Sequence, residues 1–415
     1  MSDDPLRNLG QDPRGIVSVC SAHPLVISAS LQEAMAQDQF ALIECTCNQV
    51  NHRGGYTGMT PVDFVARVKE IASSVGFPEG KLLFGGDHLG PNPWKHLAAD
   101  EAMAEAKLMM RSYAEAGIRK LHLDCSMGCK GEPVALDDET TAARAADLCA
   151  VAEEVGEDFI YIIGTEIPAP GGAHEELADL EPTKPEAVRR TYDVHKRVFE
   201  AAGLSDAFKR VIAIVVQPRV ESAQMSVVLY DPERAQDLVA ARSDLCGLVY
   251  EGHSTDYQTA ASLKALVDDG FSILKVGPCL SYAVREALYG MEMAAAEVDG
   301  GPRALRDTME ALMLADPSVW DSHIHGDAAS QKSQRHYGLA DRIRYYWLKP
   351  EAVAALDSFH DRYRATLPQI GLLSQYLGGD FIKEALEAGD DFGDPDALIR
   401  RRVRRTLRPW LKACI

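Results

Sequence analysis

The sequence predicts an α/β protein of the (β/α)8-barrel class, on the strength of two observations. Eight short apolar runs recur within about 280 residues, and a helix-like stretch follows each run, which is the pattern of βα units and a parallel sheet. Each run ends in or contains a polar residue capable of chemistry, and the carboxyl ends of barrel strands form the active site. The predicted strands are 16–22, 40–47, 82–86, 120–126, 159–166, 210–217, 246–253 and 272–278.

The intervals between these runs show helical spacing of apolar residues. Asp100 can cap the helix between the third and fourth strands, and Gly117 ends it. We expect the barrel to span residues 14–300 and a mainly helical extension, 301–415, to pack on it. The predicted barrel helices lie near 24–38, 60–75, 100–117, 138–156, 184–203, 231–241, 259–269 and 280–298.

Composition excludes several classes of protein. The net charge of −19 argues against nucleic acid and anionic membranes as partners, because both require basic surface. A small anionic substrate remains compatible, since a few local cations can override the global field. The basic run 400–405 is therefore predicted to be a solvated helix face. Composition leaves a homo-oligomer open.

The cellular setting is predicted from three features of the sequence. No apolar run is long enough to span a membrane, and the polar first residues do not resemble a signal peptide. Nine cysteines, an odd number, are scattered along the chain, and most lie in apolar runs, Cys246 among them. This usage predicts reduced, buried thiols and a cytoplasmic protein.

The segment GGDHLGPNPW, residues 85–94, is the sharpest local signal. Its two glycines are expected to allow a tight turn at the strand end, with Asp87 and His88 at the rim of the barrel. Asp87 can act as a general acid or base, and His88 can bind a metal. The alternative is that the pair only braces its loop.

Two further strand ends complete a predicted metal site. Glu166 closes the fifth strand and His253 closes the seventh, and a buried carboxylate is costly unless it is paired or bound to a metal. Together with His88 they form a two-histidine, one-carboxylate set, which is typical of a divalent metal such as zinc with open positions. Glu251, two residues before His253, is the reserve ligand or a partner that orients one.

Lys275 lies inside the apolar run of the eighth strand, where a lysine needs an anionic partner or a chemical task. A Schiff base is one reading. Pairing with a carboxylate, or with negative charge that develops on the substrate, is the simpler reading.

Other apparent motifs do not support a different activity. Residues 76–81 resemble a phosphate loop but are one residue short, lack the final Ser or Thr and precede a strand. His323 and His325 resemble a metal pair but fall beyond the barrel, so a surface loop is the preferred account.

The chain resembles the GatZ/KbaZ family, the so-called non-catalytic subunits of tagatose-bisphosphate aldolase, from about residue 14 into the C-terminal region. Some members have been labelled tagatose 6-phosphate kinases, and some relatives are sugar 4-epimerases. The family is similar to the zinc-dependent class II aldolases, whose Asp–His pair matches Asp87 and His88, whereas Glu166 replaces one of their histidines. The motifs are SAHPLVI (21–27), GGDHLGPNPW (85–94), HLDCSM (122–127), IGTEIPAPGG (163–172), VVQPRVE (215–221), YEGHSTDYQT (250–259), LKVGP (274–278) and ADRIRYYW (340–347).

The resemblance implies a metal-dependent epimerase that interconverts D-tagatose 6-phosphate and D-fructose 6-phosphate, or a related ketose or hexuronate, in galactitol and tagatose catabolism. The alternative is an accessory subunit that stabilises a class II aldolase through its C-terminal helices. A kinase has no support, because no nucleotide-binding loop is visible in the sequence.

The expected mechanism is a retro-aldol cleavage, with a metal as Lewis acid at the C2 and C3 oxygens. Asp87 is the chosen base, with Glu166 and Glu251 as alternatives, and Lys275 offsets the charge of the enediolate. Arg342 is expected near the phosphate, although structural ion pairing would equally explain it. The predicted substrate-binding residues are His23, Glu44, Asn48, Asp124, Gln217, Ser254, Tyr337 and Arg342.

Overall fold

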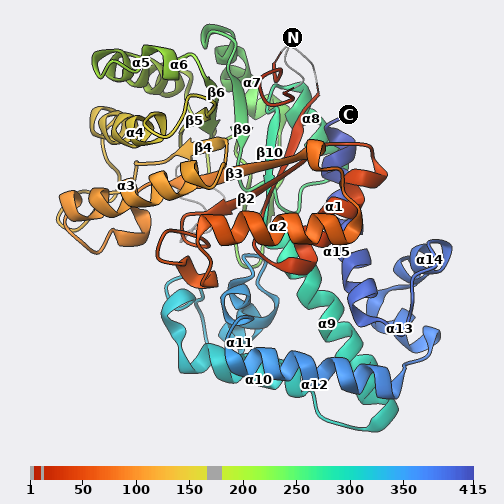
Figure 1. The fold of residues 1–415 in the computed structure, drawn as a ribbon. Coiled ribbons are helices and arrows are strands. Elements are labelled where there is room, and N and C mark those ends of the chain that lie inside the picture. The colour runs from red at the N-terminus through yellow and green to blue at the C-terminus, as the bar shows by residue number, and fades with distance from the viewer. Residues whose placement is uncertain (1–3, 11–13, 166–179) are drawn as a thin grey trace.

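Eight parallel strands close into a barrel in the computed structural model, which describes residues 4–10, 14–165 and 180–415 (Figure 1). Around the barrel the order is β1-β10-β9-β6-β5-β4-β3-β2, so the first and last strands pair. This topology confirms the predicted (β/α)8 class. The strands are β1 (Ile16–Cys20), β2 (Ala41–Thr46), β3 (Leu82–Leu89), β4 (Lys120–Leu123), β5 (Ile160–Gly164), β6 (Val211–Val216), β9 (Val249–Gly252) and β10 (Ile273–Val276).

The predicted barrel helices are present, including the one expected near 231–241, and several begin at a side-chain cap. Thr60 forms a capping box with Asp63, and Asp137 accepts a hydrogen bond from the Thr140 amide. A short hairpin of β7 (Glu221–Ser222) and β8 (Val227–Val228) was not predicted. The helices are α1 (Pro24–Ala36), α2 (Pro61–Val75), α3 (Ala99–Glu115), α4 (Asp138–Glu153), α5 (Pro185–Ala201), α6 (Ser205–Phe208), α7 (Pro232–Ala241), α8 (Ala260–Asp268) and α9 (Pro278–Asp299).

The barrel interior changes character along its axis. Its amino-terminal half is an apolar cluster that Leu6, a residue preceding the barrel, joins. Inward positions nearer the carboxyl ends are instead polar, which directs the chemistry to that end. The apolar cluster consists of Leu6, Ile16, Leu42, Ile160, Ile162, Ala213, Val215, Val249 and Ile273.

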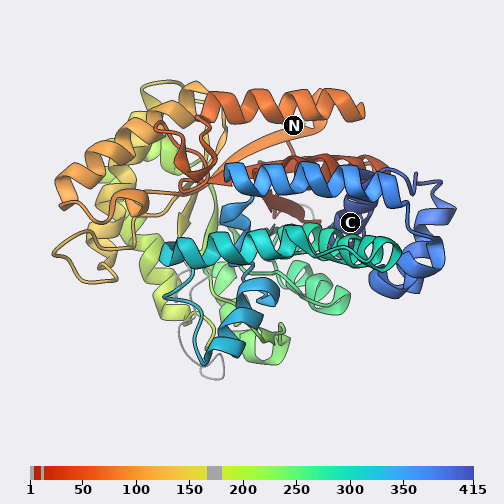
Figure 2. The same ribbon diagram turned by 90° about the horizontal axis from the view of Figure 1, so that it is seen from below.

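The long helix α9 carries the chain away from the barrel, toward the side on which the strands end (Figure 1). Of the helices that follow, the first three lie on this side, and seen from below they cover part of the barrel end, whereas the next two lie beside α9 (Figure 2). They are α10 (Ala304–Ala315), α11 (Ala328–Tyr337), α12 (Pro350–Thr366), α13 (Ile370–Leu377) and α14 (Gly379–Glu387).

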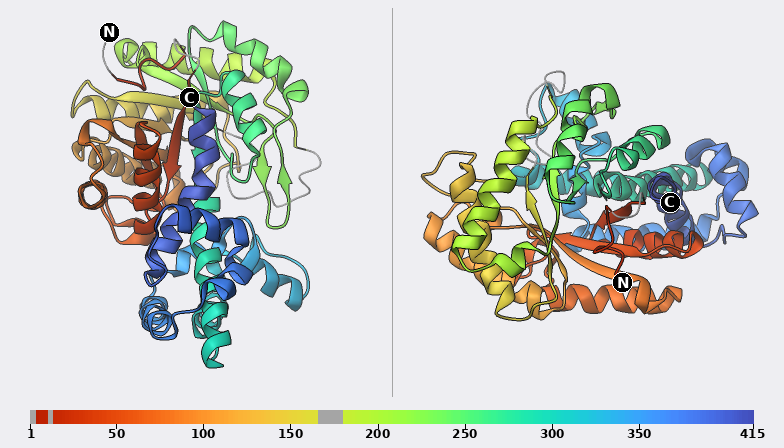
Figure 3. Two further views of the ribbon diagram at one scale, coloured as in Figure 1. Left: turned by 90° about the vertical axis from the view of Figure 1, so that its right-hand side faces the viewer. Right: turned by 90° about the horizontal axis from the view of Figure 1, so that it is seen from above.

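The last helix, α15 (Pro395–Ala413), returns to the barrel wall and packs against α1, α8 and α9 (Figure 3). The indole nitrogen of Trp410 donates to the Thr255 hydroxyl at 2.9 Å, and the Gln39 amide donates to the carbonyl of Leu411 at 2.9 Å. Because α9 has left the wall, α15 fills the position of the eighth outer helix. A domain division at residue 300 stays a prediction.

The prediction that the basic run 400–405 is a solvated face is wrong. Arg401 pairs with Asp390, and Arg404 pairs with the buried Glu33 of α1. Arg408 makes a second ion pair with Glu33. Burial opposes ionisation of Glu33, but the two guanidinium groups outweigh it and lower its pKa. The run is therefore structural and fastens α15 to the barrel.

All nine cysteines are outside disulfides. Cys246 is exposed, contrary to the expectation of burial, because β9 begins only at Val249 and Cys246 lies in the preceding turn. Within the described ranges no helix is long and apolar enough to cross a bilayer.

Candidate functional site

The carboxyl ends of the strands open into a cavity of about 1570 Å³. Strand-end residues form its floor, and the loop containing Asn48 and Tyr56 forms part of its wall. The 3-10 turn η7 (Arg342–Tyr346), which belongs to the C-terminal extension, contributes another part. The cavity thus lies where barrel enzymes carry their active sites.

A bulge in β3 brings Asp87 and His88 to the same cavity. Successive side chains in a regular strand point to opposite faces. Here the pairing of β3 with β4 shifts register between Gly86 and Leu89, and His88 adopts a left-handed backbone conformation with φ of 49°. Both Asp87 and His88 line the cavity as a result.

The two glycines before Asp87 do not form the tight turn that the sequence suggested, because β3 continues through them to Leu89. They provide space instead. A Cβ atom on Gly85 would lie 2.5 Å from the Glu44 carboxylate, and one on Gly86 would lie 2.7 Å from the Tyr113 ring. Any larger residue at position 85 would displace Glu44.

At the cavity floor and directly below it lies a buried network of four charges. Lys120 Nζ lies 2.7 Å from a carboxylate oxygen of Glu44 and 2.7 Å from one of Glu251. Lys275 Nζ lies 2.5 Å from the other oxygen of Glu44. Glu44, Lys120 and Glu251 are each 0% exposed, so each needs the opposite charge beside it.

Lys275 also reaches Asp87 on the floor of the cavity, with Nζ 2.9 Å from Oδ1. Burial alone would lower the pKa of Lys275, but Asp87 and Glu44 outweigh it and raise that pKa well above its usual range. A lysine that stays protonated suits charge compensation rather than Schiff-base formation.

Asp87 is an ionised carboxylate with cationic or polar neighbours on several sides. Its Oδ1 lies 3.0 Å from His122 Nδ1, and its Oδ2 lies 3.5 Å from the Cys20 thiol. Burial opposes ionisation, but His88 and Lys275 outweigh burial and hold the pKa of Asp87 well below its usual range. The group is therefore deprotonated at neutral pH, which is the form that a general base requires.

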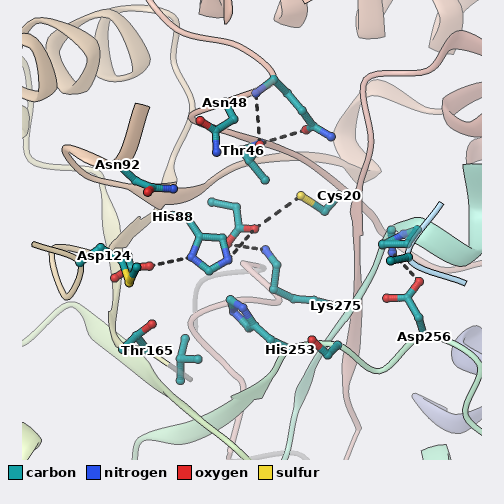
Figure 4. A pocket seen from close by; sticks show the side chains of 18 of the residues that line it. Cys20, Thr46, Asn48, His88, Asn92, Asp124, Thr165, His253, Asp256 and Lys275 are labelled. Atoms are coloured by element: carbon teal, nitrogen blue, oxygen red, sulfur yellow. Dashed lines mark hydrogen bonds and ion pairs between the residues drawn. The ribbon is translucent and has the colours of Figure 1, made fainter. Parts of the chain in front are cut away.

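Three histidine rings meet above Asp87. The ring centroids of His88 and His253 are 5.0 Å apart, and those of His122 and His253 are 5.3 Å apart. Figure 4 shows His88 in the centre of the pocket, with Asp124 on one side and Lys275 and His253 on the other.

The donor set fits a divalent metal. His88 Nδ1 donates to Asp124 Oδ2 at 2.7 Å, and His253 Nε2 donates to Glu251 Oε1 at 2.8 Å. Each carboxylate thereby orients the ring of its histidine, as is common for metal ligands. Buried and half-buried His, Asp and Glu donors here could hold a metal ion: the ligand atoms of Asp87, His122, Glu251 and His253 lie within 4.8 Å of one another, as do those of His88, His122 and Asp124. The third predicted ligand, Glu166, lies outside the described residues.

His122 and Lys120 are site residues that the sequence reasoning missed. Both ring nitrogens of His122 already face protein atoms, since Nε2 lies 3.0 Å from the Gly164 carbonyl and Nδ1 faces Asp87. His122 therefore positions Asp87. The signal was the period-two pattern of β4 and its end, in which Lys120, His122 and Asp124 are polar and alternate with leucines.

Five of the eight predicted substrate-binding residues line the cavity, and three do not. The lining residues are His23, Asn48, Asp124, Ser254 and Arg342. Glu44 lies beneath the floor, and the Gln217 side chain accepts a hydrogen bond from the Val220 amide. Tyr337, on α11, is 43% exposed away from the cavity.

His323, expected in a surface loop, is only partly exposed and lines the outer part of this cavity.

A closed barrel with an ionised carboxylate, a protonated lysine and a histidine cluster at its mouth defines a (β/α)8-barrel enzyme.

The chain belongs to the family described as D-tagatose-1,6-bisphosphate aldolase subunit GatZ/KbaZ-like, which it matches over residues 5–415. It is 54% identical over 374 residues to the D-tagatose 6-phosphate 4-epimerase of Agrobacterium fabrum, covering 88% of each chain. The crystal structure of a probable tagatose 6-phosphate kinase from Sinorhizobium meliloti 1021 superposes with a TM-score of 0.89 at 49% identity, covering 97% of this chain and 100% of that one. These matches confirm the resemblance found in the sequence.

Proposed function

We propose that this protein interconverts D-tagatose 6-phosphate and D-fructose 6-phosphate by inverting the configuration at C4. The 54% identical relative is named for this reaction. The observation that carries the proposal is the contact between Asp87 and Lys275, at 2.9 Å, on the cavity floor beside the histidine cluster. These two side chains place a base and a compensating cation next to each other.

The C4 hydrogen is not α to the C2 carbonyl, so simple deprotonation at C4 is difficult, and carbon–carbon cleavage avoids it. Asp87 removes the proton of the C4 hydroxyl, and the C3–C4 bond breaks to give an aldehyde at C4. The electron pair passes to the C2–C3 unit as an enediolate. The Lys275 ammonium offsets its charge.

The aldehyde then rotates and presents its other face. The C3–C4 bond re-forms, and Asp87 returns its proton to the new C4 oxygen. Asp87 thus acts as the base in the first step and as the acid in the last step. Glu251, the alternative base, is fully buried beneath His253 and pairs with Lys120, so Asp87 is better placed to reach a substrate.

We propose that His88 and His253 hold a divalent metal, with Glu166 or Glu251 as the carboxylate. Zinc suits a nitrogen and oxygen donor set with an open position. A bound divalent ion would supply a Lewis acid for the substrate oxygens at C2 and C3. The nine free thiols support a cytoplasmic location.

The test is to incubate the purified protein alone with tagatose 6-phosphate and a divalent metal in heavy water. Fructose 6-phosphate is expected as product, with no solvent deuterium at C4, because the C4 hydrogen stays on carbon throughout. Mass spectrometry and NMR of the product check this, against a parallel reaction in ordinary water.

Substantial deuterium at C4 would instead favour direct proton transfer. Turnover only after a class II aldolase subunit is added would support an accessory role, which the family description as an aldolase subunit also suggests.

Metal content should fall strongly in His88→Ala and His253→Ala, because each removes one imidazole ligand. Elemental analysis of the purified proteins measures it. His360→Ala is the matched control, since His360 pairs with Asp396 on the extension and should leave metal content unchanged. Unaltered metal in both site variants would refute the assignment.

A further inference from the structure

We propose that η7 of the C-terminal extension holds the phosphate ester of the substrate, through the guanidinium groups of Arg342 and Arg344. The amino end of α9, where barrels commonly bind phosphate, does not serve this purpose. The inference rests on the proposed function for the identity of the ligand, and it assigns part of the active site to the extension.

The amino end of α9 is already occupied by the protein's own carboxylate. Asp256 Oδ1 accepts hydrogen bonds from the Gly277 amide at 3.2 Å and from the Cys279 amide at 2.8 Å. Asp256 is only 3% exposed, so it is held in this position. A phosphate approaching these amides would find them bonded and would meet a carboxylate.

Both arginines line the same cavity as Asp87 and His88. The protein's own contacts fix the Arg344 side chain: it donates to the Asp341 carbonyl at 3.1 Å and to the Tyr345 hydroxyl at 2.9 Å. Its guanidinium lies 4.5 Å from the centre of the Tyr345 ring, and that of Arg342 lies 5.9 Å from the same centre. Two guanidinium groups therefore lie near the Tyr345 ring on one wall of the cavity.

Arg344 lacks a carboxylate partner at ion-pair distance within the part of the chain that the structure describes. The carboxylates of Asp341 and Asp256 act on Arg344 only from beyond ion-pair distance. A cation in a substrate cavity in this state is stabilised when a ligand brings an anion into direct contact with it. Burial lowers the pKa of Arg342 to about 10, so this second guanidinium is still charged at neutral pH. Two guanidinium groups on one wall match the charge of a phosphate dianion, and each can donate two parallel hydrogen bonds to it.

Tyr345 and Tyr56 complete this wall, with their ring centroids 4.9 Å apart. Burial opposes ionisation of Tyr345, but Arg344 and Arg342 outweigh it and lower its pKa, which shows how positive this region is. In Figure 4 Asp256 lies apart from the cluster around His88, so the α9 end and the reacting centre are separate regions of one cavity.

Calorimetric titration of the full-length protein with D-fructose 6-phosphate and with D-fructose tests this assignment. Arg342→Gln and Arg344→Gln should each weaken binding of the phosphate ester by about 10- to 100-fold, the value of one lost charge-assisted hydrogen bond. Binding of D-fructose should not change. Lys95→Gln, which alters an exposed lysine lining the same cavity, should leave both affinities unchanged.

Inorganic phosphate should compete with the phosphate ester in the wild type and lose this ability in the two variants. Thermal unfolding checks that the variants fold. If a glutamine variant does not fold, Arg344→Lys keeps the charge without the two-pronged geometry, and a partial loss of phosphate-ester affinity is then expected.

The proposal is overturned if both glutamine variants bind the phosphate ester like the wild type. It is also overturned if the variants lose affinity for both sugars equally, or if the wild type does not bind the ester more tightly than the free sugar. If the arginine variants selectively lose binding of the phosphate ester but the wild type has no epimerase activity, the phosphate site is supported and the proposed function is refuted. If the wild type is an epimerase but the arginine variants change the affinity for the ester and for the free sugar equally, only the phosphate site is refuted.

Discussion

Asp87→Asn is expected to lower kcat/KM for tagatose 6-phosphate by about 100- to 10,000-fold, the usual contribution of a general acid–base group. The amide keeps the shape of the carboxylate but cannot take the C4 hydroxyl proton. It also leaves Lys275 without one of its anions, which lie 2.9 Å away at Asp87 and 2.5 Å away at Glu44.

Steady-state kinetics of the purified variant measures this loss. Cys20→Ser is the matched control. The Cys20 thiol also contacts Asp87, 3.5 Å from Oδ2, but replacing it with a hydroxyl removes no charge from the site. We expect the control to stay close to wild-type activity. An Asp87→Asn enzyme within tenfold of the wild type would show that another group is the base.

Lys120→Met is expected to reduce the free energy of unfolding by about 3–5 kcal/mol, the cost of removing one partner from a buried ion pair. Lys120 is 0% exposed and lies 2.7 Å from both Glu44 and Glu251. Without it, two buried carboxylates share Lys275, whose Nζ is 3.9 Å from Glu251. Methionine fills the space but supplies no charge.

Urea unfolding of the wild type and the variant measures the difference. The double variant Lys120→Met/Glu44→Gln should recover part of the loss, because it removes one of the uncompensated carboxylates. Lys107→Met is the surface control: its ion pair with Asp147 is exposed, and it should change stability by less than about 1 kcal/mol. Equal effects at Lys107 and Lys120 would contradict the account.

The rule that polar groups at strand ends form the site identified Asp87, His88, His253 and Lys275, and the structure brings these four to one cavity. The same rule placed Glu44 with the substrate, whereas Glu44 lies one layer deeper. A side chain's depth depends on the stagger of neighbouring strands, and one chain's sequence does not display that stagger.

The sequence by itself determined the alternation of strands and helices, because hydrophobic periodicity is set by residues close together in the chain. It also determined which strands end in groups capable of chemistry. The tertiary structure alone decided how those groups pair. Glu44, Lys120, Glu251 and Lys275 meet only because the barrel closes and brings β2, β4, β9 and β10 around one axis.

The tertiary structure likewise decided what the C-terminal region contributes. The local sequence of the arginine-rich segment of α15 predicts a solvated helix face. In the folded protein the segment completes the barrel wall, because the buried Glu33 carboxylate of α1 pairs with it. The turn containing Arg342 reaches the cavity because α9 carries the chain past the barrel mouth. Contacts between residues hundreds of positions apart arise from chain closure and packing, and local patterns carry no signal of them.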